Sequence, residues 1–379
     1  MSEVRVNNLS NENNTGGPTI SGITTYSGRH FFVPPQGDTA SRPSDCEPGS
    51  LRFNTDSAHL EYFRGNTIGW VEVEAELTKP LGGGTGSNEG LGHRGFFLGG
   101  INGGASDIID QITISTLGDA LDFGNLTDQK FIGGGGASRT RAVCMGGGTP
   151  VRLNLIDFFS MATSGNSTDF GDTTTPRAEG GGLSNSIRAI YVGGSGPSSP
   201  SGENTIDFIT ISSTGNAVDF GDETASSTVE KQGALASTTR GIIAGGSGYS
   251  GRISFLTIMT TGNTEDFGDL TAQTTANSGG GNATRGVISL GHSTNTIDFI
   301  TIATTGDAVD FGDRTLNNYS HASCSSPTRM TTGGGYDGSS NTNIIDFVEI
   351  ATTGNAQDFG DLSYARRSLG GTSNGHGGL

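Results

Sequence analysis

Short apolar segments bounded by Gly, Asn, Ser and Thr recur along most of this chain. The clearest is Ile-Asp-Phe-Ile-Thr-Ile at residues 206–211. Its length, its β-branched and aromatic content and its flanking residues are typical of a β-strand. Strand alternation places Asp207 on one face with Ile209 and Ile211, and leaves apolar groups on both faces. Such a strand is expected in a sheet that is covered on both sides.

The segment belongs to a unit of about 47 residues that occurs six times over residues 94–363. In each unit an Arg opens a short apolar strand that usually ends in Gly-Gly. An Ile-Asp-Phe strand follows, then a turn of the Thr-Gly-Asn type and an Asp-Phe-Gly strand. The second residue of Ile-Asp-Phe and the Asp before Phe-Gly are 12 residues apart in every copy (110→122, 157→169, 207→219, 254→266, 298→310, 346→358). A fourth strand fits in the Gly-rich stretch before the next Arg.

Four short strands per unit, without helical periodicity, predict an all-β fold: a six-bladed β-propeller of four-stranded blades, preceded by a small N-terminal β module. The chain ends in Gly-His376-Gly-Gly, which parallels Gly-His93-Arg94-Gly before the first unit. We therefore expect residues 80–93 and 364–379 to meet and close the ring, which removes open sheet edges. The Gly-Gly after an apolar strand resembles kelch repeats, which are propellers. The Trp of kelch blades is missing, since Trp70 lies outside the units.

A change in pattern before residue 94 indicates further parts of the chain. Four regions are predicted: a polar, Asn-rich arm at 1–16, a small β attachment module at 17–76, a Gly-rich linker and ring-closing segment at 77–93, and the propeller at 94–379. Within the module, residues 48–56, 60–63 and 69–73 are predicted to form three strands joined by short turns.

The module contains Pro48-Gly-Ser-Leu-Arg-Phe-Asn-Thr-Asp56, then Leu-Glu-Tyr at 60–62 and Gly-Trp-Val at 69–71. This combination resembles a β module of virion structural proteins in tailed phages, especially cyanophages. The repeat strings, such as Ile-Asp-Phe-Ile-Thr-Ile followed by Asp-Phe-Gly-Asp, are similar to those in marine phage structural proteins. The resemblance implies a virion component, such as a fibre, an appendage or a head decoration.

Composition narrows the classes of function. The chain has 379 residues, 65 of them Gly, and a net charge of −17. No basic stripe is present, so nucleic-acid binding is not expected, and an acidic surface disfavours anionic membranes. The three cysteines, at positions 46, 144 and 324, include no Cys-x-x-Cys pair, which argues against a disulfide framework or a zinc site. Residues 1–16 lack the apolar stretch of a signal peptide, and no apolar run is long enough to insert in a membrane.

Residues that repeat around a propeller are expected to serve the scaffold. We predict that the Phe of each Asp-Phe-Gly packs between blades and that the Arg opening each first strand pairs with a buried Asp of the repeat. In the fourth unit Ser254 replaces that Asp, which makes Arg240 an internal control. The arginines are Arg94, Arg141, Arg188, Arg240, Arg285 and Arg329; the aspartates are Asp110, Asp157, Asp207, Asp298 and Asp346; the phenylalanines are Phe123, Phe170, Phe220, Phe267, Phe311 and Phe359.

Three chemical interpretations of the repeat were weighed. Asp-Phe-Gly is also the magnesium motif of protein kinases, but the other kinase motifs are missing, so a turn is expected. The Asp-x-Gly shape resembles the Asp-boxes of sialidase propellers, yet no Tyr nucleophile or Arg triad can be placed. Asp219 and Asp222 offer too few oxygen ligands for calcium. We expect no catalytic residue, no metal and no cofactor.

The loop that varies between units, from Gly-Gly to the Ile-Asp-Phe strand, is the expected recognition surface. Its candidate residues are Tyr249, Arg252, Tyr336 and Asp337. Loops without any role are the alternative.

The favoured function is a non-enzymatic structural protein of a phage virion, made in the host cytoplasm. Its N-terminal region would contact other virion proteins, and its propeller would bind a host-surface glycan or protein or brace neighbouring subunits, with oligomers expected. One alternative is a glycan-cleaving propeller enzyme of a phage tail, which needs paired carboxylates in one cleft. The other is a cellular kelch-like interaction scaffold.

Overall fold

The computed structural model describes residues 34–57, 59–72, 93–131, 133–197, 202–224, 230–247, 250–292 and 294–379. The chain divides into two compact units, residues 1–82 and 83–379. Every regular element among the described residues is a β-strand, so that part of the chain has no helix able to cross a membrane. The predicted arm at 1–16 and most of the linker at 77–93 lie outside the described residues.

The described part of unit 1 is one small sheet in the order β1-β2-β3-β4. Three of its strands match those predicted, and β1 is added parallel to β2. The strands are β1 (Gln36–Gly37), β2 (Leu51–Asn54), β3 (His59–Phe63) and β4 (Trp70–Glu72).

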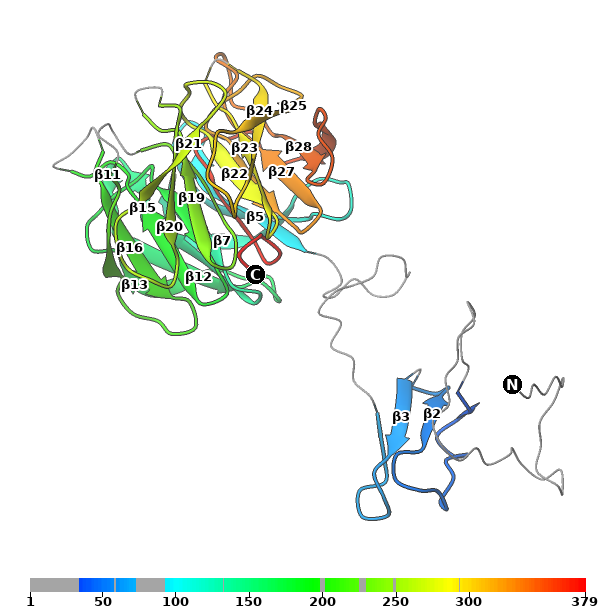
Figure 1. Ribbon diagram of the computed structural model, residues 1–379. Coiled ribbons are helices and arrows are strands. Elements are labelled where there is room, and N and C mark those ends of the chain that lie inside the picture. The colour runs from blue at the N-terminus through cyan, green and yellow to red at the C-terminus, as the bar shows by residue number, and fades with distance from the viewer. Residues whose placement is uncertain are drawn as a thin grey trace. The chain divides into compact units, whose positions relative to one another are not determined.

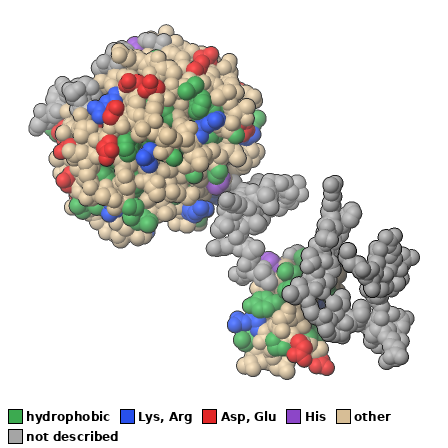
Figure 2. Space-filling model, viewed as in Figure 1, with side chains coloured by type: hydrophobic (Ala, Val, Ile, Leu, Met, Phe, Trp, Pro, Cys, Tyr) green, Lys and Arg blue, Asp and Glu red, His purple; other side chains and the backbone are tan. Residues whose placement is uncertain are grey.

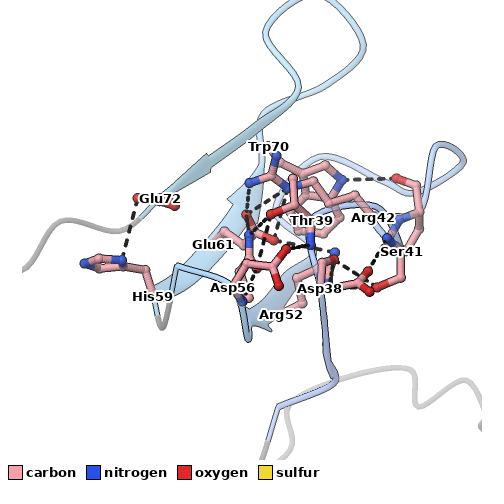
Figure 3. A network of polar contacts seen from close by, with 12 residues as sticks. Asp38, Thr39, Ser41, Arg42, Arg52, Asp56, His59, Glu61, Trp70 and Glu72 are labelled. Atoms are coloured by element: carbon pink, nitrogen blue, oxygen red, sulfur yellow. Dashed lines mark hydrogen bonds and ion pairs between the residues drawn. The ribbon is translucent and has the colours of Figure 1, made fainter.

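A buried ion cluster lies at the centre of this sheet (Figure 3). The Glu61 carboxylate is fully buried and accepts hydrogen bonds from Arg42 at 2.7–3.3 Å, with Arg52 Nη1 at 3.5 Å from its Oε1. The hydrogen bonds from Arg42 hold the pKa of Glu61 below its usual value. Asn54 Nδ2 also donates to Glu61, and Trp70 Nε1 donates to the Pro43 carbonyl. The polar side chains of Arg52, Asn54 and Glu61 thus serve the local fold.

Unit 2 consists of repeated four-stranded antiparallel sheets, which we call blades. Each blade has four strands in a fixed order. A Gly-rich inner strand pairs with the Arg strand, and the Arg strand pairs with the Ile-Asp-Phe strand. The Ile-Asp-Phe strand pairs in turn with the outer Asp-Phe-Gly strand. The predicted all-β architecture of repeated four-stranded units, of the β-propeller type, is confirmed. Blade 1 is β30-β5-β6-β7, blade 2 is β8-β9-β12-β13, blade 3 is β14 to β17, blade 4 is β18 to β21, blade 5 is β22 to β25 and blade 6 is β26 to β29.

The strand bounds follow the four positions in the blade. The inner strands are β30 (Gly370–Ser373), β8 (Gly134–Ala137), β14 (Gly181–Ser184), β18 (Gly233–Ala236), β22 (Ser278–Gly281) and β26 (Ala322–Ser325). The Arg strands are β5 (Arg94–Ile101), β9 (Arg141–Met145), β15 (Arg188–Val192), β19 (Arg240–Ala244), β23 (Arg285–Ser289) and β27 (Arg329–Gly333).

The remaining strands lie farther from the centre. The Ile-Asp-Phe strands are β6 (Ala105–Thr113), β12 (Leu155–Ser160), β16 (Thr205–Thr210), β20 (Arg252–Thr257), β24 (Thr296–Thr301) and β28 (Ile344–Glu349). The outer strands are β7 (Leu121–Lys130), β13 (Thr168–Asp172), β17 (Val218–Asp222), β21 (Glu265–Asp269), β25 (Val309–Asp313) and β29 (Gln357–Asp361). A short hairpin, β10 (Gly148–Thr149) with β11 (Val151–Arg152), is added in blade 2.

The Gly-rich strand joins the blade that follows it, so each blade begins one strand earlier than the sequence unit. Blade 1 therefore takes its inner strand from the C-terminal β30, which pairs with β5. The red C-terminal segment runs among the differently coloured blades (Figure 1). Residues 80–92, which we expected to take part in closure, lie outside the described residues.

Apolar side chains form six clusters, each between two neighbouring blades, in place of one central core. The inner strands contact one another in the closed order β8, β14, β18, β22, β26, β30 and back to β8. Their close approach requires small residues. A Cβ on Gly182 would lie 2.5 Å from Gly134 C and Gly135 O, inside van der Waals distance. This packing explains much of the unusual Gly content.

The antiparallel order gives each blade two different ends. We call one end the turn face, where short turns join the inner strand to the Arg strand and the Ile-Asp-Phe strand to the outer strand. The other end is the loop face, where the variable loops and the links between blades lie. β5 starts at the turn face, and so residue 93 enters unit 2 on that side.

Candidate binding face

The six phenylalanines of the Asp-Phe-Gly strands are buried, with 2–4% of each exposed. The register of each outer strand shifts at the Phe, as in the pairs Ile206 with Gly221 and Asp207 with Asp219. Such a bulge redirects a side chain. Phe220 lies in a cluster with Ile243 and Leu256 of the next blade. The other five occupy the same place: Phe123, Phe170, Phe267, Phe311 and Phe359.

The arginines that open the Arg strands do not bind the repeated aspartates, so this part of the prediction is wrong. Each guanidinium donates to a main-chain carbonyl at the end of an Ile-Asp-Phe strand in the next blade, at 2.6–3.5 Å. Five of them also stack on the Phe of their own Ile-Asp-Phe strand, at 4.3–4.7 Å. The arginines are Arg94, Arg141, Arg188, Arg240, Arg285 and Arg329. Arg94 lacks the stacked ring because Gln111 replaces the Phe.

The repeated aspartates are buried, and their partners come from the link that leaves the preceding blade. Thr174 donates to Asp207 through its main-chain N at 3.1 Å and its Oγ1 at 2.6 Å, and Arg177 Nη2 donates at 2.7 Å. Equivalent partners are Ser363 and Arg366 for Asp110, Thr127 and Lys130 for Asp157, Thr315 and Arg314 for Asp346, and Thr271 for Asp298. A second, irregularly spaced set of cations thus pairs with four of the five aspartates: Asp110, Asp157, Asp207 and Asp346.

Each Asp-Phe-Gly strand is also held by the turn of the next blade. The Gly has φ of 146–151°, a conformation that favours glycine. A Cβ on Gly221 would lie 2.5 Å from Gly262 O in the next blade. Asn263 of that turn accepts a hydrogen bond from Asp222 N at 2.9 Å. In several copies the first Asp caps its own turn, as Asp169 does with Gly171 N. The motif is therefore a structural turn.

The loop residues predicted for recognition have different environments. Tyr336 is half-buried and Asp337 is exposed. Hydrogen bonds from Ser340 N and Ser339 N keep the pKa of Asp337 below its usual value. Arg252 contacts Thr224 and lies 3.5 Å from Asp266, so it is partly engaged in the scaffold. Tyr249 lies outside the described residues.

A set of positions that the sequence analysis did not identify lies on the loop face. In each blade, one residue lies seven positions after the Arg that opens the Arg strand. Main-chain hydrogen bonding joins it to a residue of the link that precedes the inner strand of the same blade. Reciprocal hydrogen bonds, such as Ser195 N to Ala178 O at 2.7 Å and Ala178 N to Ser195 O at 3.1 Å, hold most of these bridges. The six bridge pairs are Ile101–Arg367, Gly148–Phe131, Ser195–Ala178, Ser247–Glu230, His292–Thr275 and Tyr336–Tyr319.

The bridges keep one backbone geometry and carry unrelated side chains. This combination is expected of a recognition surface on a rigid scaffold. A constant offset was visible in the sequence (94→101, 141→148, 188→195, 240→247, 285→292, 329→336). The residue types at these positions follow no common pattern, so the sequence alone does not distinguish them. On the face in view, Figure 2 shows charged side chains scattered among polar groups.

Inside the bridges lies the mouth of the central channel, which we define by Glu179, Lys231, Ala276, Ser320 and Ser368. Each has φ of 58–65°, a conformation that non-glycine residues rarely adopt. Main-chain hydrogen bonds of 2.6–3.3 Å join them in sequence from blade 3 round to blade 1. The backbone at the mouth is therefore fixed.

One sector of the mouth is a cluster of opposite charges, in which Lys231 Nζ and Arg152 Nη2 lie 3.8 and 4.0 Å from Glu179 Oε2. The pKa of Glu179 is raised by burial and by Glu230, while Lys231 and Arg152 oppose the shift. The Glu179 and Glu230 side chains are hydrogen-bonded to each other. Ser195 Oγ donates to Glu179 at 3.3 Å, and Ser247 Oγ donates to Glu230 at 2.7 Å.

The opposite sector is aromatic. The His292 and Tyr319 rings lie 4.9 Å apart, and the Tyr319 and Tyr336 rings 5.6 Å apart. The Arg367 guanidinium lies 4.4 Å from the Tyr336 ring. We call these four residues the aromatic arc; they belong to bridge pairs of three neighbouring blades and are half-buried.

The mouth leads to a cavity of about 80 Å³, which is room for a few water molecules. One of its lining residues has a buried acceptor without a donor. Gln232 Nε2 donates to Glu223 at 2.8 and 3.0 Å, and Gln232 Oε1 has no partner. The His321 ring lies against two main-chain carbonyls, with its Nε2 3.4 Å from Ser289 O and the Asn318 carbonyl as the second. Gln232 is 7% exposed and His321 4%.

At the turn face, the C-terminal residues cover the inner strands. Leu379 N donates to His376 O, and Gly378 N donates to His376 Nδ1 at 3.2 Å. His376 Nε2 therefore carries the proton and donates to Ala137 O at 3.0 Å. Residues 376 and 377 line the second cavity of the channel, about 40 Å³ in volume. This tail narrows the channel from the turn face.

The repeated blades and their closed circuit of inner strands define a β-propeller repeat architecture. The described residues contain no group of three or more His, Cys, Asp or Glu side chains arranged to hold a metal ion. Burial raises the pKa of the Cys144 thiol to about 11, which disfavours a reactive thiolate. The sequence matches no protein-family model and is not significantly similar to any curated protein.

Proposed function

We propose that this protein is a non-enzymatic structural protein of a tailed-phage virion, with an N-terminal attachment region and a closed six-bladed propeller that presents its loop face for attachment to a host surface. One observation carries the display role. The repeated side chains are used between blades, whereas the bridge pairs offer different side chains at one fixed backbone position. The virion assignment rests on the phage-like motifs of residues 48–71 and of the repeats.

All six bridge pairs lie at one end of the blades. β5 begins at the turn face, and the bridge pairs lie on the loop face. The repeated contacts between blades keep the bridge pairs at fixed spacing, which lowers the entropic cost of recognition.

Paired carboxylates were the feature that a glycan-cleaving enzyme required. Glu179 and Glu230 are such a pair, and both lie outside the repeat pattern. However, two carboxyls in direct hydrogen bonding are closer together than the roughly 5–9 Å that glycoside hydrolysis uses. Lys231 and Arg152 also lie 3.8 and 4.0 Å from Glu179, so the pair is better explained as part of a local ion cluster, and we retain the binding function.

Peptide mass spectrometry of purified particles from the phage that encodes the chain tests this assignment. Peptides from residues 94–379 should be present at a stoichiometry typical of structural proteins and should remain after a high-salt wash. Expression of the protein in infected cells without incorporation into particles would contradict the proposal. A variant without residues 1–76 should be lost from particles while its propeller still folds.

A further inference from the structure

We propose that the aromatic arc and the mouth of the channel form a binding site for a neutral, hydroxyl-rich glycan. The inference rests on the proposed display function and specifies the ligand class of its loop face. It starts from two features that occur together: half-buried aromatic rings and an unsatisfied buried acceptor.

The aromatic arc and the mouth with its cavity are formed by residues that are adjacent in the sequence. Tyr319 belongs to the aromatic arc, Ser320 to the mouth, and His321 lines the cavity. In the next link, Arg367 packs on Tyr336, and Ser368 belongs to the mouth. A ligand that lies on the arc therefore reaches the mouth directly.

The unpaired acceptor defines what the ligand must donate. A buried acceptor without a donor costs on the order of 1–3 kcal/mol relative to a satisfied one. Gln232 Oε1 is such an acceptor in a residue that lines the cavity. A hydroxyl group of a ligand can donate to it.

The size of the cavity limits how much of the ligand enters. Pockets that enclose whole small molecules usually measure about 300–1,000 Å³, whereas this cavity measures about 80 Å³. It accepts a hydroxyl or hydroxymethyl group, and the sugar ring stays outside. Aromatic side chains such as Tyr319 and Tyr336 offer the apolar surface and polar tip on which a sugar ring can lie.

Charge decides between neutral and anionic glycans. Glu179 and Glu230 stand at the same mouth, and the chain carries a net charge of −17. Carboxylate, sulfate or phosphate groups on a glycan would be repelled there. Three cations lie near the mouth, and all are engaged: Arg367 is stacked on Tyr336, and Lys231 and Arg152 lie 3.8 and 4.0 Å from Glu179. The arrangement favours uncharged sugars.

A glycan array probed with the full chain tests the ligand class. Neutral hexose oligosaccharides should be retained, while sialylated, sulfated and phosphorylated ones should not. The best neutral oligosaccharide is then titrated by calorimetry against Tyr336→Ala, which should weaken binding at least tenfold. Val309→Ala, at an exposed position on an outer strand, is the matched control and should bind as the original protein does.

Ligand variants test the role of the Gln232 acceptor without changing the protein. In a series of singly O-methylated forms of the same oligosaccharide, one position should lose binding at least tenfold, because its hydroxyl no longer donates inside the cavity. Lack of neutral-glycan binding at millimolar concentration, preference for anionic glycans, or equal binding by Tyr336→Ala would overturn the inference. Particle membership is measured independently by mass spectrometry, so the failure of one proposal is distinguishable from the failure of the other.

Discussion

At the scale of single residues, two sets of cations serve the same interfaces in different ways. The periodic arginines bind carbonyls and aromatic rings, while the irregular set, such as Arg177 and Arg366, neutralises buried aspartates. The sequence made the periodic set obvious, because it repeats with the blades. The second set lies in links of variable length, where only the three-dimensional structure shows which cation reaches which Asp.

Asp207 and Asp298 provide a matched comparison. Both accept two hydrogen bonds from one Thr, but only Asp207 has a cation partner, Arg177. We expect Asp207→Asn to cost about 3–5 kcal/mol, because Arg177 is left buried without its counter-charge. Asp298→Asn should cost no more than about 1 kcal/mol, because burial raises the pKa of Asp298 and already disfavours its charge. Urea unfolding at pH 7 measures both, and equal losses would contradict this account.

His376 should make stability depend on pH. Burial lowers its pKa from 6.5 to about 4. Between these values the unfolded chain binds a proton that the folded chain does not, so this residue's contribution falls as pH decreases from about 6.5 toward 4. The difference in unfolding free energy between the original protein and His376→Gln should therefore shrink from pH 7 to pH 5. A difference that stays constant over this range would show that His376 is not buried in its neutral form.

At the scale of strands and turns, the sequence predicted the elements well and their grouping less well. Short β-branched segments, Gly turns and the constant 12-residue spacing identified the Arg, Ile-Asp-Phe and Asp-Phe-Gly strands. The inner strands were harder to recognise, because sequences such as Gly-Gly-Gly-Ala at 134–137 have low strand propensity. Backbone contact around the channel selects these residues, and local propensity does not show such contact.

Inner-strand glycines should tolerate no side chain. Gly182→Ala places a methyl group 2.5 Å from Gly134 C and Gly135 O. Overpacking of this kind costs about 1–3 kcal/mol. Gly104→Ala is the control, because no heavy atom lies within 4 Å of its Cβ. Thermal unfolding should show a clear loss for the first variant and nearly none for the second. A loss of similar size in both would indicate that the inner strands are loosely packed.

At the scale of the whole molecule, blade 1 joins the two ends of unit 2. β30 pairs with β5, Arg366 pairs with Asp110 at 2.8 Å, and Phe359 packs against blade 1. The resemblance between the segments around His93 and His376 predicted that the ends would meet. It could not predict that residues 374–379 would fold over the channel, because a Gly-rich segment has no pattern that specifies its path.

Removal of residues 364–379 should therefore damage more than one blade. The edge of β5 and the buried Asp110 would both lose their partners, and an open strand edge promotes association. We expect a lower melting temperature and aggregates in size-exclusion chromatography. Removal of 375–379 alone keeps β30, and should leave the oligomeric state of the original protein unchanged with a smaller decrease in melting temperature. A product of the larger deletion that is as stable as the original protein and does not aggregate would show that closure does not depend on β30.

The pairing of β30 with β5 also sets an order of events during translation. β5, β6 and β7 leave the ribosome early, yet the inner strand of their blade comes from residues 370–373. Domains usually fold as units while the chain grows at about 5–20 residues per second. Between β5 and β30 lie more than 260 residues of synthesis, which at that rate takes from about a quarter of a minute to a minute. During that time the edge of β5 is open, and nascent chains on one messenger RNA are close enough to exchange strands.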